Sequence, residues 1–302
     1  KQRRRLMFDY KDLKNLIREV LNEQLLSLKE GGNIFKSQED EPLTKRIDRA
    51  DVDPTLEWLE NEVLNFDGDK KLNLVDHKLG TTGEKETSGD LDIAIDEKKV
   101  SKDELINKLV IWLEKNHPDY NYRDWIHKTG VSVHFKTPIK TEEGGDEFNG
   151  YVQTDLMFGN PDFMLWAVKG EPEGSEYRGG DRQRLINAIA TIAPEDKLAE
   201  EGYAWAPFSG LKDRKTKEKF TNPQEIVNKV LGTNYKPEDF DKIKILFGIL
   251  NDPKNRTKYP DNIYKAIEEK AGFKLPPRVE GKPESLDEAK KDSPRIQHAE
   301  DL

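Results

Sequence analysis

Several kinds of site are excluded by residues that the chain lacks. None of its 302 residues is cysteine, which excludes disulfides, thiolate nucleophiles and cysteine-ligated zinc sites. There is no run of about eighteen apolar residues, the length that a membrane-spanning helix needs, and no signal-like apolar segment follows the basic residues 1–5. We therefore expect no membrane span and no export signal. The absence of cysteine also fits a reducing, cytoplasmic location.

An excess of basic charge is missing as well. The chain has 50 Lys and Arg residues against 59 Asp and Glu residues, a net charge of -9. Because contacts of Lys and Arg with phosphates dominate non-specific binding of duplex DNA, this balance argues against a processive enzyme on long DNA. The five histidines (77, 117, 127, 134 and 298) show no metal-ligand spacing and are interpreted as ordinary polar residues.

The most informative segment runs from Gly80 to Ile95. It begins with the turn Gly-Thr-Thr-Gly and continues into a predicted strand that carries Asp90 and Asp92. Successive side chains of a strand point to opposite faces, so these two acids share a face and the apolar residues between and after them share the other. Two carboxylates on a strand suit Mg²⁺ or Mn²⁺, and the turn ahead of them can present backbone N–H groups and hydroxyls to an anion.

A third acid lies in a second predicted strand over residues 151–158. There, Asp155 is flanked by apolar residues, and burying an isolated carboxylate costs several kcal/mol unless a cation or a proton compensates it. A metal shared by Asp90, Asp92 and Asp155 is the economical solution. Without the third acid the pattern would be weak, because many surface strands alternate acidic and apolar residues.

With these three acids the chain resembles the DNA polymerase β-like nucleotidyltransferase superfamily, whose signature is a Gly-Ser or Gly-Thr turn, Asp-x-Asp on a strand and a third Asp on a neighbouring strand. The likeness extends to the palm and thumb of family X DNA polymerases over residues 75–240. It is carried there by Gly179-Gly180-Asp181 at a helix start, Ser209-Gly210-Leu211 in a hairpin, and Leu231-Gly232-Thr233-Asn234-Tyr235-Lys236-Pro237-Glu238.

The resemblance implies an enzyme that moves a nucleoside monophosphate from an NTP or dNTP to an acceptor hydroxyl, releases pyrophosphate and uses two metal ions. The metal ligands would be the three acids. The nucleotide-binding residues would be Gly80, Thr81, Gly83, Lys85, Ser88, Gly89, Gly179, Gly180, Arg182 and Arg184. The family places an arginine in the turn before the Asp pair, where this chain has only a lysine. The two arginines of the helix start are therefore the alternative phosphate contacts.

Two classes of function stay open. Three acids in place favour catalysis, whereas the missing turn arginine and the acidic composition favour a catalytically silent protein of the same fold with a structural or assembly role. For the enzyme, the acceptor would be the 3′ end of a nucleic acid, or a protein or small molecule.

The predicted fold class is α+β, with a nucleotidyltransferase palm (residues 69–170) that follows an N-terminal helical region (1–68). A smaller thumb-like α+β lobe (171–274) and a disordered tail (275–302), which could bind a protein partner, complete the chain. Within these regions the sequence predicts a helix over 9–29, a connector over 37–53, a helix from Pro54 to Leu64, a helix opened by the capping box Ser101–Glu104, and a strand over 131–136 with one solvated face.

Overall fold

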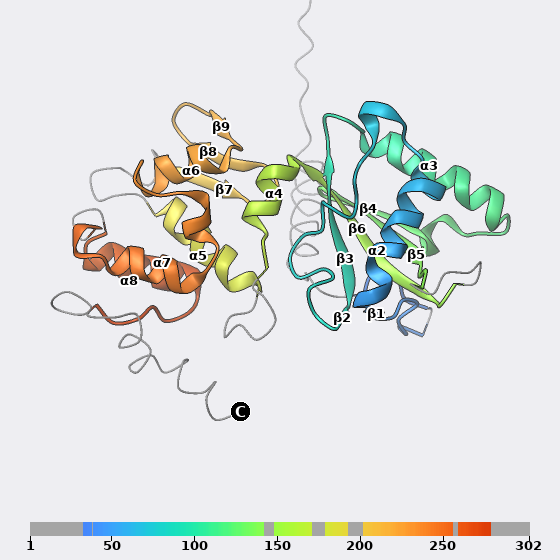
Figure 1. Cartoon of the computed structure of the whole chain (residues 1–302), viewed down its shortest axis with the longest axis horizontal. Coiled ribbons are helices and arrows are strands. Elements are labelled where there is room, and N and C mark those ends of the chain that lie inside the picture. Colours follow the sequence, from blue (N-terminus) through green and yellow to red (C-terminus); the bar gives the residue numbers. More distant parts are fainter. Residues whose placement is uncertain are drawn as a thin grey trace, which may run out of the picture.

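The computed structural model describes residues 33–37, 39–141, 148–170, 179–192, 202–255 and 259–278. They form two lobes that lie side by side, with helix α4 (Pro161–Ala167) between them (Figure 1). The predicted α+β class is confirmed. The helix predicted over 9–29 and the tail beyond residue 278 lie outside the described residues. No helix in the described ranges has both the length and the apolarity to cross a membrane.

The first lobe is built on a four-stranded mixed sheet. Its strands, in spatial order, are β3 (Asp90–Asp96), β6 (Tyr151–Gly159), β5 (Ser132–Pro138) and β4 (Ile126–Thr129). β3 runs parallel to β6, and the other pairs are antiparallel. The alternation read from the sequence holds, because Leu91, Ile93 and Ile95 are fully buried on the face opposite the two acids.

Helices cover the apolar face of this sheet. They are α2 (Arg49–Trp58), the π-helix Leu59–Leu64 that continues it, and α3 (Lys102–Asn116), and all three share one core with β3, β5 and β6. The predicted capping box is confirmed at the start of α3, where Ser101 accepts from the N–H of Glu104 and the Glu104 carboxylate accepts from the N–H of Ser101. Short 3₁₀ turns occur at Gly68–Lys70 and Tyr122–Asp124.

The start of α2 differs from the sequence prediction. The helix begins at Arg49, and Pro54, expected at its first turn, lies inside it. The turn before the proline is helical because Val52 (1% exposed) packs into the core with Leu56, and burial outweighs the hydrogen bond that proline cannot donate. Ahead of the helix, β1 (Ile47–Asp48) pairs with β2 (Thr87–Ser88).

Two predicted boundaries therefore move. The segment 37–53, expected to be a connector, contains β1 and the first turn of α2. Residues 47–64, assigned to a separate N-terminal region, share the core of the sheet, so the first lobe starts well before residue 69. In the same way α4 packs into the core of the second lobe, although it lies before residue 171.

The second lobe combines helices with a small antiparallel sheet. Its elements are α5 (Gly179–Thr191), β7 (Tyr203–Ala206), β8 (Gly210–Asp213), β9 (Lys219–Phe220), α6 (Pro223–Val230), α7 (Ile243–Asn251) and α8 (Asp261–Ala271), with 3₁₀ turns at Pro237–Phe240 (η5) and Pro253–Asn255. Its core also receives Ala94 of β3. Since Ala94 follows the two acids on the same face of β3, the second lobe packs on the sheet just beyond them.

The predicted start of the tail is wrong by several residues. Leu275 is 3% exposed in the core of the second lobe, and the carbonyl of Pro276 accepts from the hydroxyl of Tyr264 (2.6 Å). Arg278 donates to Asp261 (2.9 Å) and to the carbonyl of Tyr259. These contacts attach residues 275–278 to α8, although their sequence has no apolar period.

A pair of truncations tests this packing. Ending the chain after Lys274 removes the burial of Leu275 and the contacts of Pro276 and Arg278, whereas ending it after Arg278 keeps them. We expect the shorter chain to lose about 2 kcal/mol or more of unfolding free energy relative to the longer one in urea denaturation. Equal midpoints for the two truncations would contradict the packing.

Candidate metal and nucleotide site

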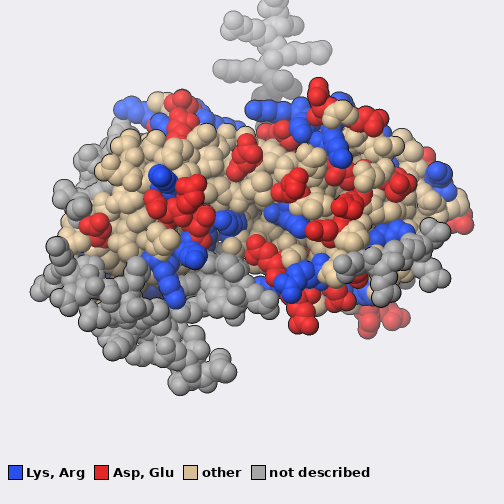
Figure 2. All heavy atoms as spheres, in the orientation of Figure 1, with Lys and Arg blue, Asp and Glu red and all other residues tan. Residues whose placement is uncertain are grey.

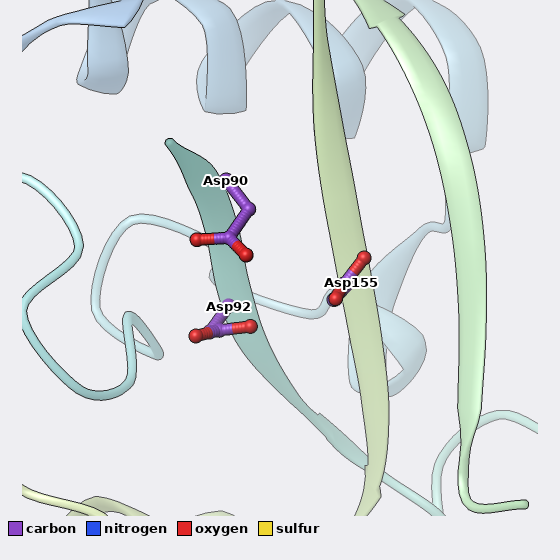
Figure 3. A group of neighbouring side chains, drawn as sticks. All are labelled: Asp90, Asp92 and Asp155. Atoms are coloured by element: carbon purple, nitrogen blue, oxygen red, sulfur yellow. The ribbon is translucent and has the colours of Figure 1, made fainter. Parts of the chain in front are cut away.

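Three aspartates from two neighbouring strands come together at the edge of the first lobe that faces the second. The register of the parallel pair sets Asp92 beside Asp155, and Asp90 one step further along the same face of β3 (Figure 3). One carboxylate oxygen from each lies within 4.8 Å of the others. The convergence predicted from the sequence is confirmed, and we call this group the aspartate cluster (Asp90, Asp92 and Asp155).

The cluster is partly withdrawn from water and its charges repel. Asp155 is 7% exposed. Burial of Asp90, together with the negative charge of Asp155, raises the pKa of the Asp90 carboxyl, while its own backbone N–H, Arg46 and His134 oppose that rise. Three hard oxygen ligands with an excess of negative charge at one point fit Mg²⁺ or Mn²⁺, which bind carboxylates and keep further positions for water or phosphate.

The glycine turn (Gly80–Gly83) is hydrogen-bonded to the strand that carries the acids. The N–H of Leu79 donates to the carbonyl of Asp92 (2.7 Å), and the N–H of Asp92 donates to the hydroxyl of Thr82 (3.1 Å). Gly80 has φ +62°, and a Cβ there would lie 3.9 Å from the Asp92 carboxylate. A glycine therefore allows the chain to reverse direction directly beside the aspartate cluster.

A cavity of about 540 Å³ opens beside the cluster. It is lined by Asn33, Pro42, Thr44, Lys45, Arg46, Thr81, Thr82, Lys85, Thr87, Ser88, Gly89, Asp90, Asp92 and Gln153. Of the residues predicted to bind nucleotide, Thr81, Lys85, Ser88 and Gly89 lie in it. Gly83 lies just behind, where its N–H donates to the Ser88 hydroxyl (3.2 Å). Two carboxylates, several side-chain hydroxyls, the backbone at Gly89 and three cationic side chains thus line the same cavity.

Arg46 is a member of this cavity that the sequence prediction missed. Its Nε donates to the hydroxyl of Thr87 (2.9 Å) and its Nη2 to the Thr87 carbonyl (2.8 Å). A Cβ at Gly89 would lie 3.2 Å from its Nη1, so the glycine leaves room for the guanidinium. The β1–β2 pairing brings Arg46 and the neighbouring Lys45 close to Thr87, which lies 41 residues after Arg46. No local pattern in the sequence predicts that pairing.

The structure contradicts the predicted phosphate contact of Arg182. The side chain is 0% exposed. Its Nε donates to the carbonyl of Phe240 (2.6 Å) and its Nη1 to the carbonyl of Trp166 (2.8 Å). The buried Arg182 guanidinium therefore links α5 to α4 and η5. Because it is inside the second lobe, a phosphate cannot reach it.

The other predicted residues of α5 also lie outside the cavity. Arg184 is bonded to Asp181 within its own helix, and its guanidinium lies 5.8 Å from the ring centre of Phe273. Gly179 and Gly180 form the first residues of the helix, and a Cβ on Gly180 would have no neighbour within 4 Å. Among the described residues, those that line the cavity come from the first lobe and the segment before it.

A second cleft, of about 640 Å³, lies between the lobes and shares Gly80 with the glycine turn. Two lysines line it, and each is ion-paired within the protein: Lys78 with Asp53 (2.5 Å) and Lys169 with Asp241 (2.8 Å). Since these charges are already compensated, the first cavity is the better site for an anionic group.

The polar face of β5 is not solvated, contrary to the sequence prediction. Ser132 is 6% exposed and His134 is 9% exposed. His134 lies opposite Asp155 in the β5–β6 ladder, and its Nδ1 is 2.7 Å from Asp155 Oδ1. His134 is buried on this face because it adjoins Asp155 of the aspartate cluster, while the Lys136 ammonium lies 4.1 Å from the ring centre of Trp125.

Comparison of the sequence with protein-family models and with curated proteins found no match. The chemistry of the site is therefore defined by its own residues. Three converging carboxylates could hold a divalent cation, and the cavity beside them offers hydroxyls, backbone N–H groups and cationic side chains that suit an anion.

Removing one charge from the cluster should stabilise the metal-free protein. Because the folded-state pKa of Asp90 is raised, its ionised carboxylate lowers the free energy of unfolding at neutral pH, and this penalty fades as the pH falls from the raised pKa towards the ordinary value of 3.8. We expect Asp90→Asn to unfold at a higher urea concentration than wild type in EDTA at neutral pH, with a difference that shrinks as the pH is lowered.

The matched control for this measurement is Asp96→Asn, which removes a charge from the other end of the same strand. It should change stability little, and added Mg²⁺ should stabilise wild type more than Asp90→Asn. A destabilised Asp90→Asn protein in EDTA would show that the carboxylate contributes to folding and is not held against repulsion.

Proposed function

We propose that the chain is a metal-dependent nucleotidyltransferase with a palm like that of the DNA polymerase β-like superfamily, transferring a nucleoside monophosphate from an NTP or dNTP to an acceptor hydroxyl. The observation that carries this proposal is the aspartate cluster at one end of a cavity whose rim holds a glycine turn, hydroxyls and cations. The reaction needs carboxylates next to phosphate-binding groups, because a divalent cation held by the carboxylates must contact the phosphates of the bound nucleotide.

In the proposed reaction the acceptor oxygen forms a bond to the α-phosphorus and loses its proton, while the bond from that phosphorus to the bridging oxygen breaks and pyrophosphate leaves. Mg²⁺ or Mn²⁺ held by the aspartate cluster would supply the charge that makes the acceptor hydroxyl more acidic and neutralises the phosphates. The rigid strands β3 and β6 keep the three carboxylates in place, so that little reorganisation is needed.

The residues of the cavity rim would hold the departing phosphates. Thr81 and Ser88 offer hydroxyls, and the backbone at Gly89 can approach an anion closely. Arg46 is already oriented by two hydrogen bonds to Thr87, so it can replace the turn arginine that the sequence lacks. Lys85 and Lys45 add charge at the same rim.

The acceptor is proposed to be a nucleic-acid 3′ end, with a protein or small-molecule hydroxyl as the alternative. On the described part of the face in Figure 2, basic side chains are interspersed with acidic ones, without a continuous basic surface. Together with the net charge of -9, this favours an acceptor that is bound briefly near its end over a long duplex held along its length.

The decisive test is Asp155→Asn. With labelled NTPs and dNTPs, Mg²⁺ or Mn²⁺, and a set of single-stranded and recessed 3′ ends, we expect wild type to transfer label and release pyrophosphate. We expect the variant to be slower by roughly 100-fold or more, because one ligand of the metal is lost. Its melting temperature should be unchanged or higher. Asp96→Asn serves as the control and should remain active.

A variant Asp155→Asn within a few-fold of wild type would contradict the catalytic assignment. A wild-type protein that binds Mg²⁺ and a non-hydrolysable NTP, yet transfers nothing to any acceptor, would instead support the alternative of a catalytically silent protein with a structural role.

Arg46 gives a second prediction. Arg46→Ala should weaken binding of a non-hydrolysable NTP by about 2 kcal/mol, roughly 30-fold in Kd, the scale of a charge-assisted hydrogen bond. Arg184→Ala is the matched control, since that side chain is bonded to Asp181 in the second lobe. Equal losses in the two variants, measured by calorimetric titration, would contradict a specific role for Arg46.

A further inference from the structure

A row of side chains crosses the sheet at right angles to its strands. The ladder partners are Asp92 with Asp155, Asp155 with His134, and His134 with His127, so four strands contribute one residue each on the same face. Two of these residues belong to the aspartate cluster. The histidines continue the row away from it, and the first of them is in contact with a metal ligand.

His134 is held at both ring nitrogens. Its Nδ1 lies 2.7 Å from Asp155 Oδ1, and its Nε2 lies 2.6 Å from the hydroxyl of Thr129 on β4. A carboxylate can only accept, so Nδ1 is assigned as the donor, and Nε2 is then free to accept from the threonine hydroxyl. The two bonds fix the ring in its plane, and the side chain is 9% exposed.

The second oxygen of Asp155 is also held. Gln153 donates to Asp155 Oδ2 (3.2 Å), and its own carbonyl oxygen accepts from the N–H of Ile34 (2.9 Å). With a donor on each oxygen, the carboxylate of Asp155 has a set orientation before any ligand arrives. Of the two donors, His134 makes the shorter bond and is itself anchored to a neighbouring strand.

We propose that His134 is a positioning residue that orients Asp155 towards Asp90 and Asp92 and thereby sets the affinity of the aspartate cluster for a divalent cation. Partners that hydrogen-bond to a metal-ligating carboxylate fix its direction, and their loss weakens metal binding by about 10–100-fold. The effect on metal binding does not depend on what the site does. Only the expected effect on turnover rests on the proposed nucleotidyl transfer.

The alternative is that His134 has a purely structural role as a buried side chain that packs within the lobe. His127 provides the comparison, because it lies next to His134 on the same face and packs edge-on against Phe35 with ring centres 5.2 Å apart. A purely structural role predicts that both histidines affect stability and that neither affects the metal specifically.

Two conservative variants separate these readings. His134→Asn keeps an N–H donor at the position of Nδ1, next to Asp155, whereas His134→Gln places its donor near the position of Nε2, next to Thr129. Both fill part of the same space, so they stay informative even if His134→Ala does not fold. Binding of Mn²⁺ to the metal-free 302-residue protein is measured by calorimetric titration, alongside melting temperature and steady-state kinetics.

We expect His134→Asn to bind Mn²⁺ within about 3-fold of wild type, and His134→Gln to bind it about 10-fold or more weakly. His127→Ala should bind Mn²⁺ as wild type does. In turnover, His134→Gln should lower kcat at saturating Mg²⁺ less than at limiting Mg²⁺, and leave the KM for NTP nearly unchanged.

Equal Mn²⁺ affinity in the Asn and Gln variants, or an equal loss in His127→Ala, would overturn the positioning role, as would a wild-type protein that binds no Mn²⁺. Failure of the proposed function looks different: wild type would bind Mn²⁺ and show the Asn–Gln difference, and would transfer no nucleotide to any acceptor.

Discussion

Three carboxylates within 4.8 Å of one another repel, and partial burial removes water that would otherwise screen them. Much of the first lobe can be understood from the need to hold this arrangement. The parallel register of β3 and β6 sets the acids side by side. His134 and Gln153 donate hydrogen bonds to Asp155, and a backbone N–H and the positive charge of Arg46 stabilise the ionised form of Asp90. A bound cation would reduce the remaining repulsion between the three carboxylates.

The same face of the sheet serves two purposes along its length. Beside the acids it borders an open cavity with a cationic rim, and one residue pair further on, at Ala94 and its ladder partner Met157, it packs against the core of the second lobe. The glycine turn lies at this junction, where the N–H of Gly80 donates to Val168 and the N–H of Gly170 donates to Gly80. The second lobe is therefore attached to the turn that would hold phosphate, and its position and the shape of the site are linked.

Much of the architecture could be predicted from short stretches of sequence. Alternation placed Asp90 and Asp92 on one face of a strand, the Ser101–Glu104 spacing predicted the start of α3, and flanking apolar residues identified Asp155 as a buried acid. These predictions succeeded because strand period and helix capping depend on neighbouring residues. The start of α2 was missed because burial of Val52 outweighed the local signal of Pro54.

By itself, then, the sequence determined the class of fold and the three acids, since both are written in local periods and in residues whose burial needs a compensating charge. Only the tertiary structure decided which cations and donors face those acids. Arg46 reaches the cavity through a two-residue ladder between distant segments, Arg182 is enclosed between α4 and η5, and His134 meets Asp155 through strand register. Each of these outcomes depends on which strands pair and which surfaces pack, and pairing over long separations has no signature in a local pattern.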